Sequence, residues 1–154
     1  MLRWETNEFW GWALFRIFFS DRLNLAAITH FGVFVGAEAI TAGMELLADA
    51  RFTKKHVVFW DMRRVASMTL HDTDRAFSRQ AYKQLKPLVD AKLAQLFEVG
   101  NPINDIHKER SERLKSEPHP NQLKTCSFSD AAEWLGVDEQ DLNTFIEQNF
   151  DPSE

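Results

Sequence analysis

Three charged residues, Asp61, Arg63 and Arg64, stand out because they end a short apolar run that begins at His56. Ligands of open parallel sheets bind beyond the carboxyl ends of the strands, so an arginine here could hold an anion while Asp61 orients it. The alternative is that Asp61 caps a loop and pairs with a neighbouring arginine, because structural ion pairs far outnumber binding sites. The three residues are the first candidate binding site, and structural pairing is the favoured interpretation.

Three hydroxyl residues, Ser67, Thr69 and Thr73, follow this run. Thr69 and Asp72 have the spacing of a capping box, which predicts that a helix begins here. The dipole and the free N–H groups of a helix N-terminus favour negative charge, so these hydroxyls are candidate phosphate acceptors. Simple N-capping accounts for the same residues and is the favoured interpretation.

No set of residues has the spacing of a metal or cofactor site. His71, Asp72 and Asp74 form one local cluster, whereas a metal ion needs three or four converging ligands. The single cysteine, Cys126, excludes an internal disulfide and a zinc site built from several thiolates. The remaining histidines have no ligand-like spacing; they are His30, His56, His107 and His119. The sequence therefore predicts no cofactor and no enzyme.

The composition limits the partners and the location. The chain has 154 residues, of which 44% are hydrophobic, and this suits a folded domain. The formal net charge of -5 argues against nucleic acid as a partner, because phosphate binding needs a concentrated basic surface. The apolar stretch from Phe9 to Phe19 is interrupted by Arg16 and is shorter than the roughly 20 residues that span a bilayer. We expect a cytoplasmic protein without a transmembrane segment.

The order of the expected elements predicts the fold class. The run at 56–65 is expected to be a buried strand between two helical patterns, which is typical of a parallel α/β sheet. Residues 13–19 and 23–31 predict an antiparallel hairpin. The other expected elements are helices at 37–47, 69–85, 103–114, 129–135 and from 138, and strands at 91–99 and 123–128. The order β-β-α-β-α-β-α-β-α predicts one α/β domain over residues 1–154, with a mixed sheet and flanking helices. The core of this domain is expected at 13–137, followed by a C-terminal helix and tail at 138–154.

Helix ends and an aromatic N-terminus complete the expectations. Pro87 is expected to end the helix at 69–85 or to lie just beyond its end, Gly136 to end the next-to-last helix, and Asp138 to cap the last one. Aromatic residues precede the first strand, where they could pack on the sheet, form a homodimer patch or contact a partner. They are Trp4, Phe9, Trp10 and Trp12.

Four passages carry a family resemblance: Leu25–Gly32, Ala-Asp-Ala-Arg-Phe at 48–52, Asp-Met-Arg-Arg-Val at 61–65, and Phe-Ser-Asp-Ala-Ala-Glu-Trp-Leu-Gly at 128–136. Together they resemble the SpoIIAA-like proteins, small bacterial domains that share the fold of STAS domains and, loosely, of lipid-binding Sec14 domains. Anti-sigma-factor antagonists of this fold carry a phosphorylatable serine in an Asp-Ser pair after the central strand. Residues 67–73 hold hydroxyls but lack this pair, so the resemblance implies no phosphorylation site.

Two functional hypotheses follow. The leading one is a non-enzymatic regulatory or protein-interaction domain, whose contact surface is the edge with Asp61, Arg63, Arg64 and residues 67–73. The other, implied by the Sec14-like resemblance, is a domain that binds a lipid or apolar small molecule between the sheet and a helix. The second hypothesis requires an apolar cavity of roughly several hundred cubic ångströms, whereas the first does not.

Overall fold

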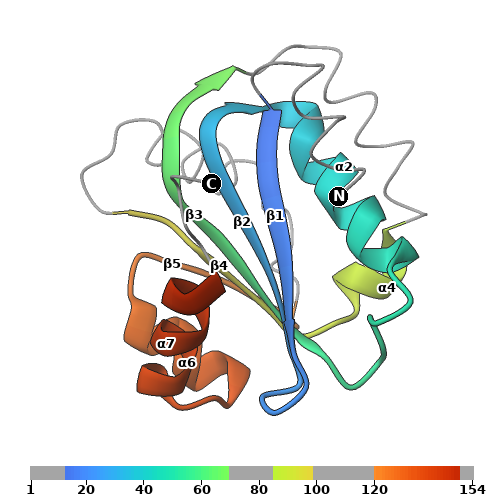
Figure 1. Cartoon of the computed structure of the whole chain (residues 1–154), viewed down its shortest axis with the longest axis vertical. Helices are drawn as coiled ribbons and strands as arrows, with labels where there is room; N and C mark the ends of the chain where they lie inside the picture. Colours follow the sequence, from blue (N-terminus) through green and yellow to red (C-terminus); the bar gives the residue numbers. More distant parts are fainter. Residues whose placement is uncertain (1–12, 70–84, 99–119, 150–154) are drawn as a thin grey trace.

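The computed structural model describes residues 13–69, 85–98 and 120–149. They form a five-stranded sheet with the strand order β1-β2-β3-β4-β5 (Figure 1). β1 runs antiparallel to β2, and the strands from β2 to β5 are parallel to one another, so the sheet is mixed. The predicted class, an α/β fold with a mixed sheet and flanking helices, is confirmed. The strands are β1 (Ala13–Ser20), β2 (Leu25–Val35), β3 (Val57–Thr69), β4 (Leu93–Leu96) and β5 (Gln122–Thr125).

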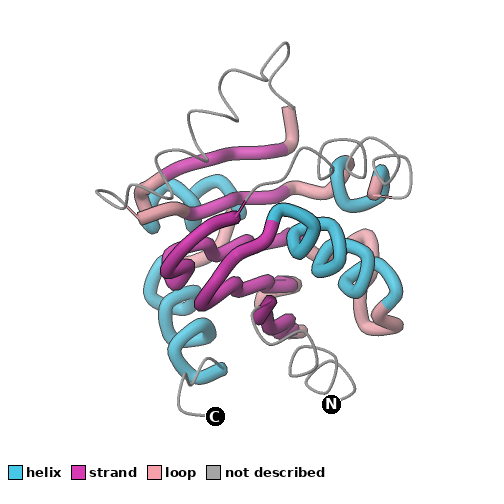
Figure 2. Tube along the Cα trace, turned by 90° about the horizontal axis from the view of Figure 1, so that it is seen from above, coloured by secondary structure: helices cyan, strands magenta, loops and turns pink. Residues whose placement is uncertain are grey.

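Helices cover both faces of the sheet (Figure 2). α2 (Gly36–Ala48) and α4 (Lys86–Val89) lie on one face, and α6 (Phe128–Leu135) and α7 (Glu139–Asn149) lie on the other. Each pair of helices closes its own hydrophobic cluster against the sheet. The described residues therefore form three layers, helix, sheet and helix.

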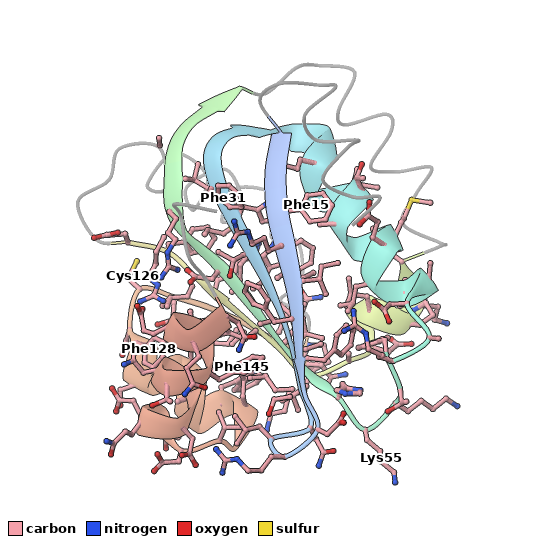
Figure 3. The ribbon with its side chains drawn as sticks, in the orientation of Figure 1. Phe15, Phe31, Lys55, Cys126, Phe128 and Phe145 are labelled. Carbon is pink, nitrogen blue, oxygen red and sulfur yellow. The ribbon has the colours of Figure 1, made fainter. Side chains whose placement is uncertain are left out.

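The central strand β3 contributes to both hydrophobic clusters. Successive side chains of a strand point to opposite faces, so Val58 and Trp60 pack toward α2 while Phe59 packs toward α6 and α7. Figure 3 shows the same division, with Phe15 on the α2 side and Phe145 within the α6 and α7 layer. A strand buried on both faces explains why residues 57–60 are all apolar.

The hairpin at the start of the sheet is confirmed. Ser20 pairs with Leu25 at the end of the β1–β2 ladder. The Ser20 hydroxyl accepts a hydrogen bond from the Leu23 N–H at 3.2 Å, and Asn24 has a φ of 50°. Asparagine tolerates this left-handed conformation better than most residues do, so the turn chemistry agrees with the hairpin.

β3 is longer and more bent than the sequence predicts. It continues four residues beyond Val65, and its register with β2 shifts between Thr29 and Phe31 and again between Gly32 and Val33. Each shift inserts one extra residue into β3, and such bulges bend a strand, as the curvature of β3 in Figure 1 shows. Gly32 has a φ of 73° at the second shift, a conformation that glycine adopts without strain.

The predicted helix ends have different outcomes. Gly136 ends α6 with a φ of 71°, and Asp138 accepts a hydrogen bond from the Asp141 N–H at 3.0 Å, so both predicted caps are confirmed. Pro87 lies in the first turn of α4, and the helix at 69–85 that it was expected to end or to follow lies mostly outside the described residues. Proline suits that position because its fixed φ is helical and its missing N–H has no partner there.

Several expectations lie outside the described residues. They concern the aromatic residues Trp4, Phe9, Trp10 and Trp12, the helix at 103–114, most of the helix at 69–85, the cluster of His71, Asp72 and Asp74, and Thr73. In the part of the chain that the structure describes, no helix is both long and apolar enough to cross a membrane.

Candidate functional site

The structure brings Asp61, Arg63 and Arg64 together at one edge of the sheet. Asp61 pairs in register with Leu96, the last residue of β4, and Leu96 pairs with Thr125, the last residue of β5. The three charged residues therefore lie where the shorter parallel strands end while β3 continues. This is the carboxyl edge at which the sequence places them.

The carboxylate of Asp61 is fully buried and accepts four hydrogen bonds. Its Oδ1 accepts from the Arg63 N–H at 3.0 Å and from Arg63 Nε at 2.9 Å. Its Oδ2 accepts from Arg63 Nη2 at 3.0 Å and from Arg64 Nη1 at 2.8 Å. A carboxylate offers about four acceptor positions, so Asp61 has none left for a ligand.

Both arginines also contact the helices of the neighbouring layer. Arg64 Nη2 donates to Glu147 Oε1 on α7 at 3.3 Å, and the Arg63 guanidinium lies 5.2 Å from the centre of the Phe128 ring on α6. Burial by itself lowers the pKa of Arg63, but the hydrogen bonds and the charge of Asp61 outweigh burial and raise that pKa above its ordinary value. The two guanidinium groups therefore join β3 to α6 and α7.

These contacts support the structural interpretation of the charged edge. The side chains of Arg63 and Arg64 are 26% and 24% exposed, so a partner could reach only part of each.

Ser67 and Thr69 lie in β3, paired with Val33 and Val35, because the strand extends further than expected. Thr73 lies outside the described residues, and the phosphate-acceptor hypothesis stays a prediction.

A pocket that the sequence does not predict lies at the opposite edge of the sheet. It is formed by the end of α2, the loop at 49–56 that enters β3, and α4, and it has a volume of about 890 Å³. Its apolar lining comprises Leu47, Phe52, Pro87 and Ala91. Leu47, Phe52 and Ala91 pack against the core cluster of this face but stay partly exposed. The floor of the pocket is therefore formed by partly exposed residues that border the hydrophobic core.

His56 is the buried polar residue of this pocket. It is 8% exposed, and its ring is stacked on Phe52 at 5.8 Å and lies edge-on to Phe19 at 5.5 Å. The Thr53 N–H donates to His56 Nδ1 at 3.0 Å. Because Nδ1 is then an acceptor, the proton of the neutral ring sits on Nε2. Among the described residues, none forms a hydrogen bond with Nε2, so this N–H is left for a molecule in the pocket.

Charged residues on the rim of the pocket favour an anion. Lys54 and Lys86 are exposed and line the opening together with Asp90. Among the described lining residues, two positive charges and one negative charge give the rim a formal charge of +1. The pocket therefore combines an apolar floor, a fixed N–H donor and a weakly positive rim.

Sequence reasoning missed this pocket because its parts are far apart in the chain. The local signal was the series Phe52-Thr-Lys-Lys-His56, in which an aromatic residue and two lysines precede the first residues of a buried strand. His56 itself has no ligand-like spacing to another histidine. In the described residues, no group of three or more His, Cys, Asp or Glu side chains could hold a metal ion.

Comparison with protein-family models finds no family that matches this chain, and comparison with curated proteins finds no relative.

Proposed function

We propose that this chain is a non-enzymatic domain that binds an apolar small molecule in the pocket between α2, the loop at 49–56 and α4. The observation that carries the proposal is the partly open pocket of about 890 Å³ whose floor continues the hydrophobic core. Small-molecule sites typically occupy 300–1,000 Å³ and combine an apolar lining with a few placed polar groups. Of the two functional hypotheses, the pocket favours the binding of an apolar small molecule.

The expected affinity follows from the apolar lining. Each buried methylene contributes about 0.8 kcal/mol, so a chain of about six methylenes gains roughly 5 kcal/mol before the costs of association. The costs of association offset part of this gain, so a simple alcohol such as octanol should bind weakly, with a Kd no lower than about 1 mM. A natural ligand that fills more of the pocket would bind more tightly.

A titration with octanol, followed through the amide chemical shifts by NMR, tests the proposal. We expect shifts concentrated at residues 47–56 and 86–91. Leu47→Gln, which places an amide on the apolar floor, should weaken octanol binding severalfold. Met44→Gln is the matched control, because Met44 lies on the same helix, is 39% exposed and is not part of the pocket lining. Shifts scattered over the molecule, or equal effects of the two substitutions, would overturn the proposal.

We also infer that the fold is of the SpoIIAA-like type. The support is an antiparallel β1–β2 pair followed by parallel strands in sequential order, with α2 between β2 and β3 and two helices after β5. The passages at 61–65 and 128–136, which carry the resemblance, lie in β3 and over α6. An experimental structure that included residues 70–84 and 99–119 would test the two crossover connections.

A protein-interaction domain acting through Asp61, Arg63 and Arg64 is the second candidate. The partial exposure of the two arginines favours it, but three of their guanidinium hydrogen bonds already go to Asp61. Native mass spectrometry of the protein from its own host separates the candidates. A stoichiometric small molecule supports the pocket, whereas a stoichiometric protein partner and no small molecule would support the charged edge.

A further inference from the structure

The geometry of the pocket points to a specific class of ligand: we propose that it binds an amphipathic carboxylate. The apolar tail lies on the floor formed by Leu47, Phe52 and Ala91, and the carboxylate accepts from His56 Nε2–H. This inference rests on the proposed function, because it requires that the pocket binds an apolar molecule at all.

His56 carries the inference because it is preorganised for an acceptor. More than nine-tenths of the residue is buried, and two aromatic contacts and the Thr53 N–H hold its ring in place. The Nε2–H has no partner among the described residues, and an oxygen from a ligand in the pocket would give it one. A charged acceptor gains more than a neutral one, because charge-assisted hydrogen bonds are roughly twice as strong.

The rim determines which anion fits best. Lys54 and Lys86 attract an anion, while Asp90 opposes part of that attraction, and the formal sum of +1 matches a monoanion. A carboxylate carries one negative charge, whereas a phosphate monoester carries close to two at pH 8. Each exposed lysine contributes only a small, salt-dependent attraction. The site should therefore prefer a carboxylate to an alcohol and give no advantage to a phosphate.

Three ligands with the same eight-carbon tail test this proposal: octanol, octanoate and octyl phosphate. Octanoate should bind about tenfold more tightly than octanol, and octyl phosphate no more tightly than octanoate. The double substitution of Lys54→Gln with Lys86→Gln should reduce the preference for octanoate over octanol at least threefold. Lys55→Gln is the matched control, because Lys55 is exposed in the same loop but is not part of the pocket lining (Figure 3).

The imidazole nitrogens of His56 provide a direct readout that needs no substitution. NMR should find Nε2 protonated and Nδ1 unprotonated in the free protein, and octanoate should shift the Nε2–H resonance downfield more than octanol does. Equal affinities for octanol and octanoate, or an unmoved Nε2–H resonance, would overturn the carboxylate proposal and leave the proposed function standing. A failure of octanol itself to shift the lining amides would instead overturn the proposed function.

Discussion

Asp61→Asn is the substitution that best separates a structural from a functional charged edge. Asparagine has nearly the same shape, and its oxygen could still accept from the Arg63 N–H. It removes the negative charge that holds Arg63 and Arg64, whose side chains are 26% and 24% exposed. Two partly buried cations would then lack the carboxylate that now accepts three of their side-chain hydrogen bonds.

The expected cost is large because the charges left behind are poorly solvated. Breaking a buried ion pair by removing one partner typically costs 3–5 kcal/mol, and the partial exposure of the arginines places this case at about 3 kcal/mol. In a domain of this size that corresponds to a fall in Tm of roughly 6–12 °C. A charge cluster that served only a partner would show a loss below about 0.5 kcal/mol.

The chain offers a matched control in Asp49 and Arg51. The backbone N–H and the guanidinium of Arg51 contact the carboxylate of Asp49 in the same way as those of Arg63 contact the carboxylate of Asp61. Arg51 donates to Asp49 from its N–H at 2.9 Å, from Nε at 3.0 Å and from Nη2 at 2.8 Å. Arg51 is 61% exposed, so water can solvate the guanidinium once the partner is lost. Asp49→Asn should therefore cost about 1 kcal/mol or less.

Urea unfolding of the wild type and of both variants, monitored by tryptophan fluorescence, measures the difference. We expect Asp61→Asn to lower the free energy of unfolding by at least 2 kcal/mol more than Asp49→Asn does. Equal losses for the two variants would show that burial of the arginines does not decide the energy of the cluster, and the reasoning above would fail. The slope with urea should stay the same, because a changed slope would indicate an altered unfolded state.

Three further predictions concern single residues. Gly136→Ala should lower the free energy of unfolding by about 1–2 kcal/mol, measured by urea unfolding, because Gly136 has a φ of 71°. Ser127→Ala should cost about 1 kcal/mol, because the Ser127 hydroxyl caps α6 by accepting from the Asp130 N–H at 3.1 Å, whereas the exposed Ser129→Ala should cost less than about 0.5 kcal/mol. The pKa of Arg63 is raised in the folded state, so its stabilising contribution is complete below its ordinary pKa and is lost only as the pH rises through the folded value. The difference in unfolding free energy between the wild type and Arg63→Gln should accordingly stay constant from about pH 7 to about pH 10.

The elements that the sequence predicted well are those with local determinants. The β1–β2 hairpin follows from turn residues between two apolar runs, and the end of α6 follows from Gly136, whose conformation depends only on its own backbone. The cap of α7 involves a donor three residues along the chain from Asp138. Interactions of such short span are present in the sequence itself.

The errors concern features that depend on neighbouring strands. β3 extends to Thr69 because β2 continues beside it as far as Val35, and its two bulges let the longer segment stay paired. No spacing within β3 reveals how long its neighbour is.

The two edges of the sheet show why the charged motif is easier to predict from the sequence than the pocket is. Asp61 and Arg63 are two residues apart, so their pairing depends on local geometry, and four hydrogen bonds then satisfy the buried carboxylate within the chain. The pocket around His56 instead needs segments from α2 and α4 to meet in the folded chain. A donor that lines a pocket and has no partner among the described residues is evidence for a ligand, whereas a charged cluster that satisfies itself is evidence for stability. On that argument, His56 and not Asp61 is the residue from which the search for a ligand should begin.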